Sequence, residues 1–214
     1  MRLKVRAFRG KKDVLSNLYP VKNKVVYKNV EYHSVEHGYK SQKAKCHGRE
    51  DLALKVMEIQ SAPAMMRMID SELGKEESER WKADRVDIMK TLLMSKVDRC
   101  PEFKEELLRS KGKVIAESTS HTFWASGLPE VQDTLRKPLH TWPGQNMLGI
   151  IMMTIRDEVI NDHFGSDLQS EELDNESVAE PVQNKHTETN VPEQNTSTKN
   201  ETDLSVPNTD DTKE

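Results

Sequence analysis

The residues best suited to chemistry lie in the segment SVEHGYKSQKAKCHG, where Glu36, Lys40, Lys43 and His47 follow one another at intervals of four, three and four. At about 100° per residue these positions share one face of a helix. If that face meets solvent, the charges form ordinary ion pairs worth a few tenths of a kcal/mol each (~0.2–0.5). If that face is buried, Glu36 becomes a candidate catalytic group, because it lies in the first helical turn, where the helix dipole favours an ionised carboxylate.

A second unusual segment is SHTFWASGL, in which Phe123 and Trp124 run directly into small residues outside any helical period. Loops of this kind often shape ligand pockets, and an indole face can stack on a base. A tryptophan that only closes one end of the core would give the same pattern. Both interpretations of Trp124 stay open at this point.

The third segment is WPGQNMLG, from Trp142 to Gly149, where a Pro-Gly turn precedes the start of a helix. Helix N-termini bind anions through free N–H groups, so a phosphate site is one interpretation. An ordinary helix start after a turn is the other. Neither a Walker loop nor GxGxxG is present in the sequence.

The surrounding pattern predicts a mostly helical α+β domain that positions these segments. KVVYKNVEY, residues 24–32, is typical of a tight hairpin, and Ser34 is suited to cap a helix that ends near Gly48. Further helical periodicity predicts the helices 50–59, 62–73, 77–97, 101–108 and 144–160, and residues 113–117 fit a strand. We expect one domain over residues 1–163.

Composition separates the last fifty-one residues from the rest. Residues 164–214 contain one aromatic side chain, Phe164, and are dominated by Glu, Asp, Asn, Thr and Ser, which predicts an acidic disordered tail. Because the net charge of the chain is only −4, the domain itself carries a positive balance, which suits a phosphorylated small molecule or a nucleic acid. No signal-peptide core or membrane-spanning stretch is present, so we expect an intracellular, cytoplasmic protein.

The two cysteines indicate no metal site. Cys46 and Cys100 lie far apart, without a Cys or His partner at a ligand spacing, and we expect free thiols. We therefore expect neither a metal nor a cofactor.

Together the segments resemble a known family. LSNLYP, YHSVEHGYKSQKA, FWASGL and GQNMLGIIMMTIR occur in the order of the NADAR (NAD and ADP-ribose) family, with a similar WKADRVDIM helix between them. This family includes the riboflavin-intermediate N-glycosidases, and the resemblance covers roughly residues 8–160. It implies a single α+β domain of that fold.

The resemblance also implies an activity. Members hydrolyse the bond between a base and C1 of a ribose, in phosphoribosylaminopyrimidine intermediates of riboflavin synthesis or in ADP-ribosylated guanine. The implied function is therefore an N-glycosidase whose substrate is a small N-riboside, or an ADP-ribose-containing molecule such as an ADP-ribosylated nucleic acid. A non-catalytic ADP-ribose or NAD reader is the alternative.

Site residues follow from the same resemblance. It implies that Glu36 stabilises the oxocarbenium-like transition state and helps activate water. It implies that Lys43 contacts the ribose, or traps its opened aldehyde as a Schiff base. The substrate-binding residues that it implies are Asn17, Tyr39, Trp81, Arg85, Trp124, Asn146 and Gly149.

One position departs from the family pattern. Many members have Asp three residues before the tryptophan, where this chain has His121, and Trp-Gly where it has Trp124-Ala125. His121 is open to three interpretations: contact with the base, an acid for the departing nitrogen, or a solvated loop residue.

Overall fold

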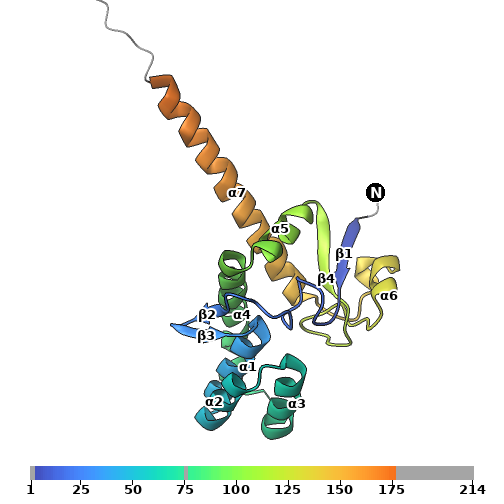
Figure 1. Ribbon diagram of the computed structural model, residues 1–214. Coiled ribbons are helices and arrows are strands. Elements are labelled where there is room, and N and C mark those ends of the chain that lie inside the picture. The colour runs from blue at the N-terminus through green and yellow to red at the C-terminus, as the bar shows by residue number, and fades with distance from the viewer. Residues whose placement is uncertain (1–2, 75–76, 177–214) are drawn as a thin grey trace, which may run out of the picture.

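Helices dominate the fold, as Figure 1 shows for the computed structural model, which describes residues 3–74 and 77–176. Within these ranges the strands are β1 (Lys4–Phe8), β2 (Val25–Tyr27), β3 (Val30–Tyr32) and β4 (Lys113–Glu117). The α-helices are α1 (Val35–Cys46), α2 (Glu50–Glu58), α3 (Ala62–Leu73), α4 (Glu79–Arg99), α5 (Pro101–Arg109), α6 (Val131–Arg136) and α7 (Met147–Glu176). The predicted mostly helical α+β class is confirmed.

The predicted hairpin and first helix are present. Strands β2 and β3 pair antiparallel, and Lys28 and Asn29 have φ angles of 48° and 63°, as a tight two-residue turn requires. Ser34 caps α1 by accepting the N–H of His37, and Gly48, at φ 70°, follows its end.

The N-terminal strand β1 was not predicted. It pairs in parallel with β4, so that Phe8 lies beside Glu117. More than a hundred residues separate the two strands, and such a pairing leaves no local pattern in the sequence. Strand β4 ends at Glu117, shortly before the 121–128 loop, so its pairing with β1 fixes the point from which this loop starts.

The last helix is longer than predicted. Helix α7 begins at Met147 and continues to Glu176, whereas the apolar periodicity indicated residues 144–160. The expected domain boundary at 163/164 therefore falls inside α7, which extends away from the other elements in Figure 1. The remainder of the predicted tail, residues 177–214, lies outside the described residues.

The main core lies between α1, α4, α5, α7 and the small sheets, and a smaller apolar cluster joins α1 to α2 and α3. At Gly38, α1 approaches α4 closely, because an added Cβ would lie 2.5 Å from a methyl carbon of Leu92. This close approach fixes the spacing between the two helices that carry most of the predicted site residues.

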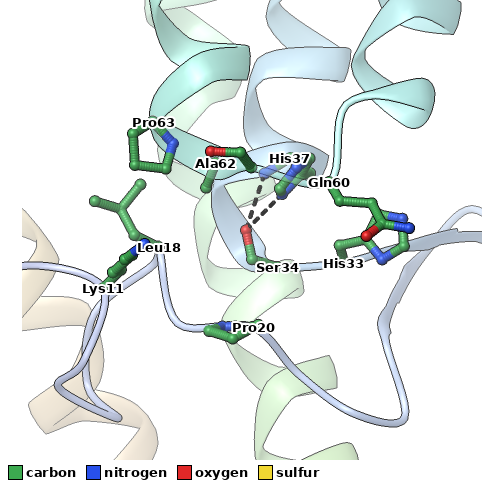
Figure 2. A pocket seen from close by; sticks show the side chains of 10 residues that line it. Lys11, Leu18, Pro20, His33, Ser34, His37, Gln60, Ala62 and Pro63 are labelled. Carbon is green, nitrogen blue, oxygen red and sulfur yellow. Dashed lines mark hydrogen bonds between the residues drawn. The ribbon is translucent and has the colours of Figure 1, made fainter.

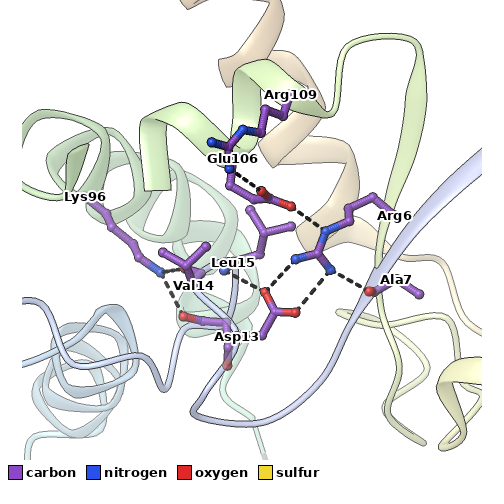
Figure 3. A network of polar contacts seen from close by, with 9 residues as sticks. Arg6, Ala7, Asp13, Val14, Leu15, Lys96, Glu106 and Arg109 are labelled. Carbon is purple, nitrogen blue, oxygen red and sulfur yellow. Dashed lines mark hydrogen bonds and ion pairs between the residues drawn. The ribbon is translucent and has the colours of Figure 1, made fainter. Parts of the chain in front are cut away.

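A polar network ties the segment between β1 and β2 to the rest of the molecule (Figure 3). Arg6 pairs with Asp13 at 3.1 Å and with Glu106 of α5 at 2.6 Å. The fully buried Lys96 of α4 donates to the backbone carbonyls of Val14, at 2.6 Å, and Ser16, at 2.8 Å. The backbone just before Asn17 is thereby held against α4.

No helix in the described ranges is long and apolar enough to cross a membrane.

Candidate active site

Helix α1 presents its charged face to other elements of the protein. The backbone N–H of Glu36 donates to the Asn17 carbonyl at 3.0 Å, which joins the helix start to the 15–20 loop. Lys40 and Lys43 are each only 8% exposed. The solvent-exposed interpretation of this face is therefore wrong for the two lysines. His47 lies at the helix end, where its Nδ1 donates to the Lys43 carbonyl at 2.8 Å.

Both lysines pair with carboxylates from other elements. The Nζ of Lys40 lies 2.6 Å from Asp70 of α3, and the Nζ of Lys43 lies 3.7 Å from Glu77. Glu77 also pairs with Arg85 of α4. It therefore links the lysine of α1 to the arginine of α4.

Aromatic rings join the same two helices to the 121–128 loop. Tyr39 lies 4.8 Å from the Trp81 ring and meets Trp124 edge-on at 5.6 Å, measured between ring centroids. Trp124 contacts Phe123 at 4.8 Å, and the Arg85 guanidinium lies 3.7 Å over the Phe123 ring. The structure thus brings together the predicted residues Tyr39, Trp81, Arg85 and Trp124 beside Glu36 and Lys43.

A second carboxylate, Glu117 at the end of β4, shares this region with Glu36. Burial, and to a smaller extent the charge of Glu36, together raise the pKa of Glu117 to about 7. Burial is also the main cause of the raised pKa of Glu36; Lys40 and Lys43 oppose it, and Asp70 adds to it. Two half-buried carboxyl groups that interact in this way hold on to a proton near neutral pH.

Unpartnered polar atoms occur at the same place. Five buried side-chain atoms in the described part of the chain have no hydrogen-bond partner: Asn17 Oδ1, Trp81 Nε1 and Arg85 Nε at this cluster, and His47 Nε2 and Asn146 Oδ1 outside it. Buried polar groups are normally paired, so each unpaired one calls for an explanation, and contact with a bound ligand is one such explanation. Trp81 itself is fully buried behind Tyr39, whereas Trp124 keeps 8% of its surface exposed.

The start of α7 is occupied by the 121–128 loop. The N–H groups of Asn146, Met147 and Leu148 donate to the carbonyls of Ala125, Phe123 and Trp124 at 3.0–3.1 Å. Gln145 donates to Thr122 in the same way. These groups are therefore not free for an anion, and the phosphate-site interpretation of this helix start is wrong.

Asn146 and Gly149 both lie against the backbone of β4. The Asn146 side chain donates to the Ile115 carbonyl at 2.8 Å, and a Cβ on Gly149 would lie 2.0 Å from that same oxygen. Among the predicted binding residues, these two are not joined to the cluster around Glu36 by any direct contact in the described structure. Their contacts dock α7 beneath Trp124 and so position the loop.

A separate pocket of about 320 Å³ lies beside the start of α1 (Figure 2). Lys11, Leu18, His33 and the first residues of α3 line it, and no predicted site residue does. On its polar wall the Nδ1 of His37 accepts a hydrogen bond from the Ser34 hydroxyl at 2.7 Å, and its Nε2 donates to the Ile59 carbonyl at 2.8 Å. The Ser34 and His37 side chains are thus already paired within the protein.

Three acidic residues of the site were missed by the sequence analysis: Asp70, Glu77 and Glu117. Asp70 lies in α3, Glu117 in β4, and Glu77 in the segment just before α4, and an acidic residue at any of these positions is explained equally well by solvent exposure. In the described ranges no group of three or more His, Cys, Asp or Glu side chains is arranged to hold a metal ion.

Comparisons with known proteins agree with the resemblance. The NADAR domain family matches residues 7–160. An N-glycosidase of Acanthamoeba polyphaga mimivirus is 34% identical over 79 residues, which are 36% of this chain and 46% of that protein. The chain thus matches about half the length of this curated relative.

A solved structure has the same fold. The NMR structure of the Escherichia coli protein YbiA aligns with a TM-score of 0.56 and 20% identity over 77% of this chain and 89% of that one. Since the family match spans most of the chain and includes Glu36, Lys43 and Trp124, this protein belongs to the NADAR domain family.

Proposed function

We propose that this protein is an N-glycosidase that hydrolyses the bond between a nitrogenous base and C1 of a ribose or phosphoribose. The observation that carries the proposal is the pair of interacting carboxyl groups, Glu36 and Glu117, beside a buried lysine and an aromatic cluster. Cleavage of an N-glycosidic bond needs an acid for the departing base and a carboxylate for the sugar cation. A coupled pair that retains one proton can provide both.

The charges nearby suggest how the two roles divide. Lys40 and Lys43 favour the ionised form of Glu36, so we assign Glu36 as the carboxylate that stabilises positive charge on the ribose ring and orients water. Burial and the charge of Glu36 raise the pKa of Glu117 to about 7, near the operating pH expected for a general acid. In the first step the C1–N bond breaks, its electron pair stays on the base, and Glu117 protonates that nitrogen. Water then adds to C1, and its proton returns to the carboxyl pair.

The remaining residues would bind the substrate. Trp124, which is buried apart from the 8% of its surface that remains exposed and is held edge-on to Tyr39, is suited to stack on the base. The Lys43 ammonium and Arg85 Nε can donate to ribose hydroxyls or to phosphate. Asn17 Oδ1 is an acceptor without a partner, suited to a hydroxyl or base N–H.

The substrate class divides into two possibilities that share this chemistry. The first is a phosphoribosylaminopyrimidine intermediate of riboflavin synthesis, and the second is ADP-ribose attached to guanine in a nucleic acid. The curated relative is called an N-glycosidase, which favours hydrolysis of such a bond over silent binding. The cations of the site suit the phosphate of either substrate.

The test is chromatographic measurement of base release from each of the two substrates in separate reactions. We expect release from at least one of them by the wild-type protein, and a loss of at least about 100-fold in Glu36→Gln, which removes the charge and keeps the side-chain volume. Glu31→Gln is the matched control, because Glu31 is an exposed glutamate of β3. Binding without release by the wild type would refute the proposal and favour a silent reader of ADP-ribose or NAD.

A further inference from the structure

His121 begins the turn that carries Trp124. Its Nδ1 lies 3.1 Å from the backbone nitrogen of Phe123 and 3.2 Å from that of Trp124, and the Ala125 N–H donates to the His121 carbonyl at 3.2 Å. Both bonds to Nδ1 require a lone pair there, so the ring is neutral with its proton on Nε2. His121 acts on this turn as an Asn or Asp cap would.

The turn is held from two sides. The α7 amides bind the carbonyls of Phe123, Trp124 and Ala125, and the His121 imidazole binds the N–H groups of Phe123 and Trp124. The α7 contacts carry no titratable group. The imidazole is therefore the one part of this clamp, among the contacts described, that a proton can remove.

The charged groups facing His121 come from both helices of the site. Burial lowers the pKa of His121; Glu77 opposes this effect, while Arg85, Lys40 and Lys43 add to it. Three cations against one carboxylate leave the neutral imidazole favoured, in agreement with the acceptor role of Nδ1.

We propose that His121 is a positioning residue: its neutral imidazole holds Trp124 in the orientation that stacks on the substrate base, and a proton on Nδ1 releases that tryptophan. The inference rests on the proposed function for the role of Trp124. The sign follows from the geometry, because a protonated Nδ1 would place an N–H against two N–H donors. Base binding thus weakens as the pH falls through the pKa of His121.

The expected effect is on KM more than on kcat. Apparent affinity falls in proportion to the fraction of protein whose His121 is neutral. That fraction decreases about tenfold for each pH unit below the pKa of His121. We expect KM of the wild type to rise as the pH falls from 7.5 to 4.5, once the pH passes below the pKa of His121, which burial lowers from its ordinary value. The variant His121→Asn keeps an acceptor at this position without titrating, so its KM should stay flat over the same range. His121→Ala loses the acceptor and should have the raised KM throughout.

Two measurements test the proposal on the full chain. The first is KM for the substrate that the wild type cleaves, across this pH range, in wild type, His121→Asn and His121→Ala. The second is the pH dependence of the Phe123 and Trp124 backbone amide resonances by NMR, which needs no turnover. We expect both amides to shift with the His121 ring in the wild type and to stay constant in His121→Asn.

The outcomes are distinguishable. If His121→Asn keeps the acid rise in KM, or if the two amides do not follow the His121 titration, the positioning role is refuted. If the wild type releases no base, the proposed function fails, and the NMR titration still decides whether His121 clamps the turn.

Discussion

Glu117→Gln should stabilise the protein at alkaline pH while it abolishes turnover. Folding raises the pKa of Glu117 from 4.5 to about 7, mainly through burial. An acid whose folded pKa is raised contributes most stability below about pH 4.5, and this contribution disappears as the pH rises through 7. A neutral glutamine of the same shape avoids the cost of the buried charge.

The magnitude follows from the two pKa values. At about 1.4 kcal/mol per pH unit, the difference corresponds to about 3 kcal/mol at pH 8 and to nearly nothing at pH 4.5. For a domain of this size, Tm changes by roughly 2–4 °C per kcal/mol, so Glu117→Gln should unfold roughly 6–12 °C above the wild type at pH 8. Differential scanning calorimetry at pH 4.5, 6, 7 and 8 measures this, with Glu31→Gln as the exposed control.

Turnover supplies the second half of the test. Glu117→Gln cannot donate a proton to the departing base, so base release should fall at least about 100-fold. If the variant gains the same stability at pH 4.5 and pH 8, or loses stability at pH 8, then ionisation of Glu117 does not destabilise the folded protein. The assignment of Glu117 as the acid would then be abandoned.

Three further variants test single contacts. If Lys43 forms an imine with the opened ribose, borohydride should attach ADP-ribose to the wild type and to the exposed control Lys45→Met but not to Lys43→Met, as read by intact mass. Lys96→Met should lower the free energy of unfolding in urea by about 2–4 kcal/mol, because two buried carbonyls lose their donor; an unchanged midpoint would contradict this. Gly149→Ala should cost about 3 kcal/mol by the same measurement, since its Cβ meets the Ile115 carbonyl at 2.0 Å, and wild-type stability would show that α7 can shift.

Local chemistry explains which parts of the fold were predictable. The hairpin turn at Lys28 and Asn29, the Ser34 cap and the Gly48 stop depend on neighbouring residues, and all three are present as expected. The β1–β4 pair and the true end of α7 were not predicted, because strand pairing across the chain leaves no local periodicity and α7 continues into a polar segment.

The site divides in the same way. The spacing along α1 determined that Glu36, Lys40 and Lys43 share a face, and the motif order determined the family. Only the tertiary structure decided that the two lysines of this face are buried and that the start of α7 is closed to anions. It also decided that Glu117 is buried near Glu36, whose charge adds to the effect of burial on the pKa of Glu117. The physical reason is range: caps and helical periodicity act over a few residues, whereas burial and charge coupling depend on which distant segments the fold places together.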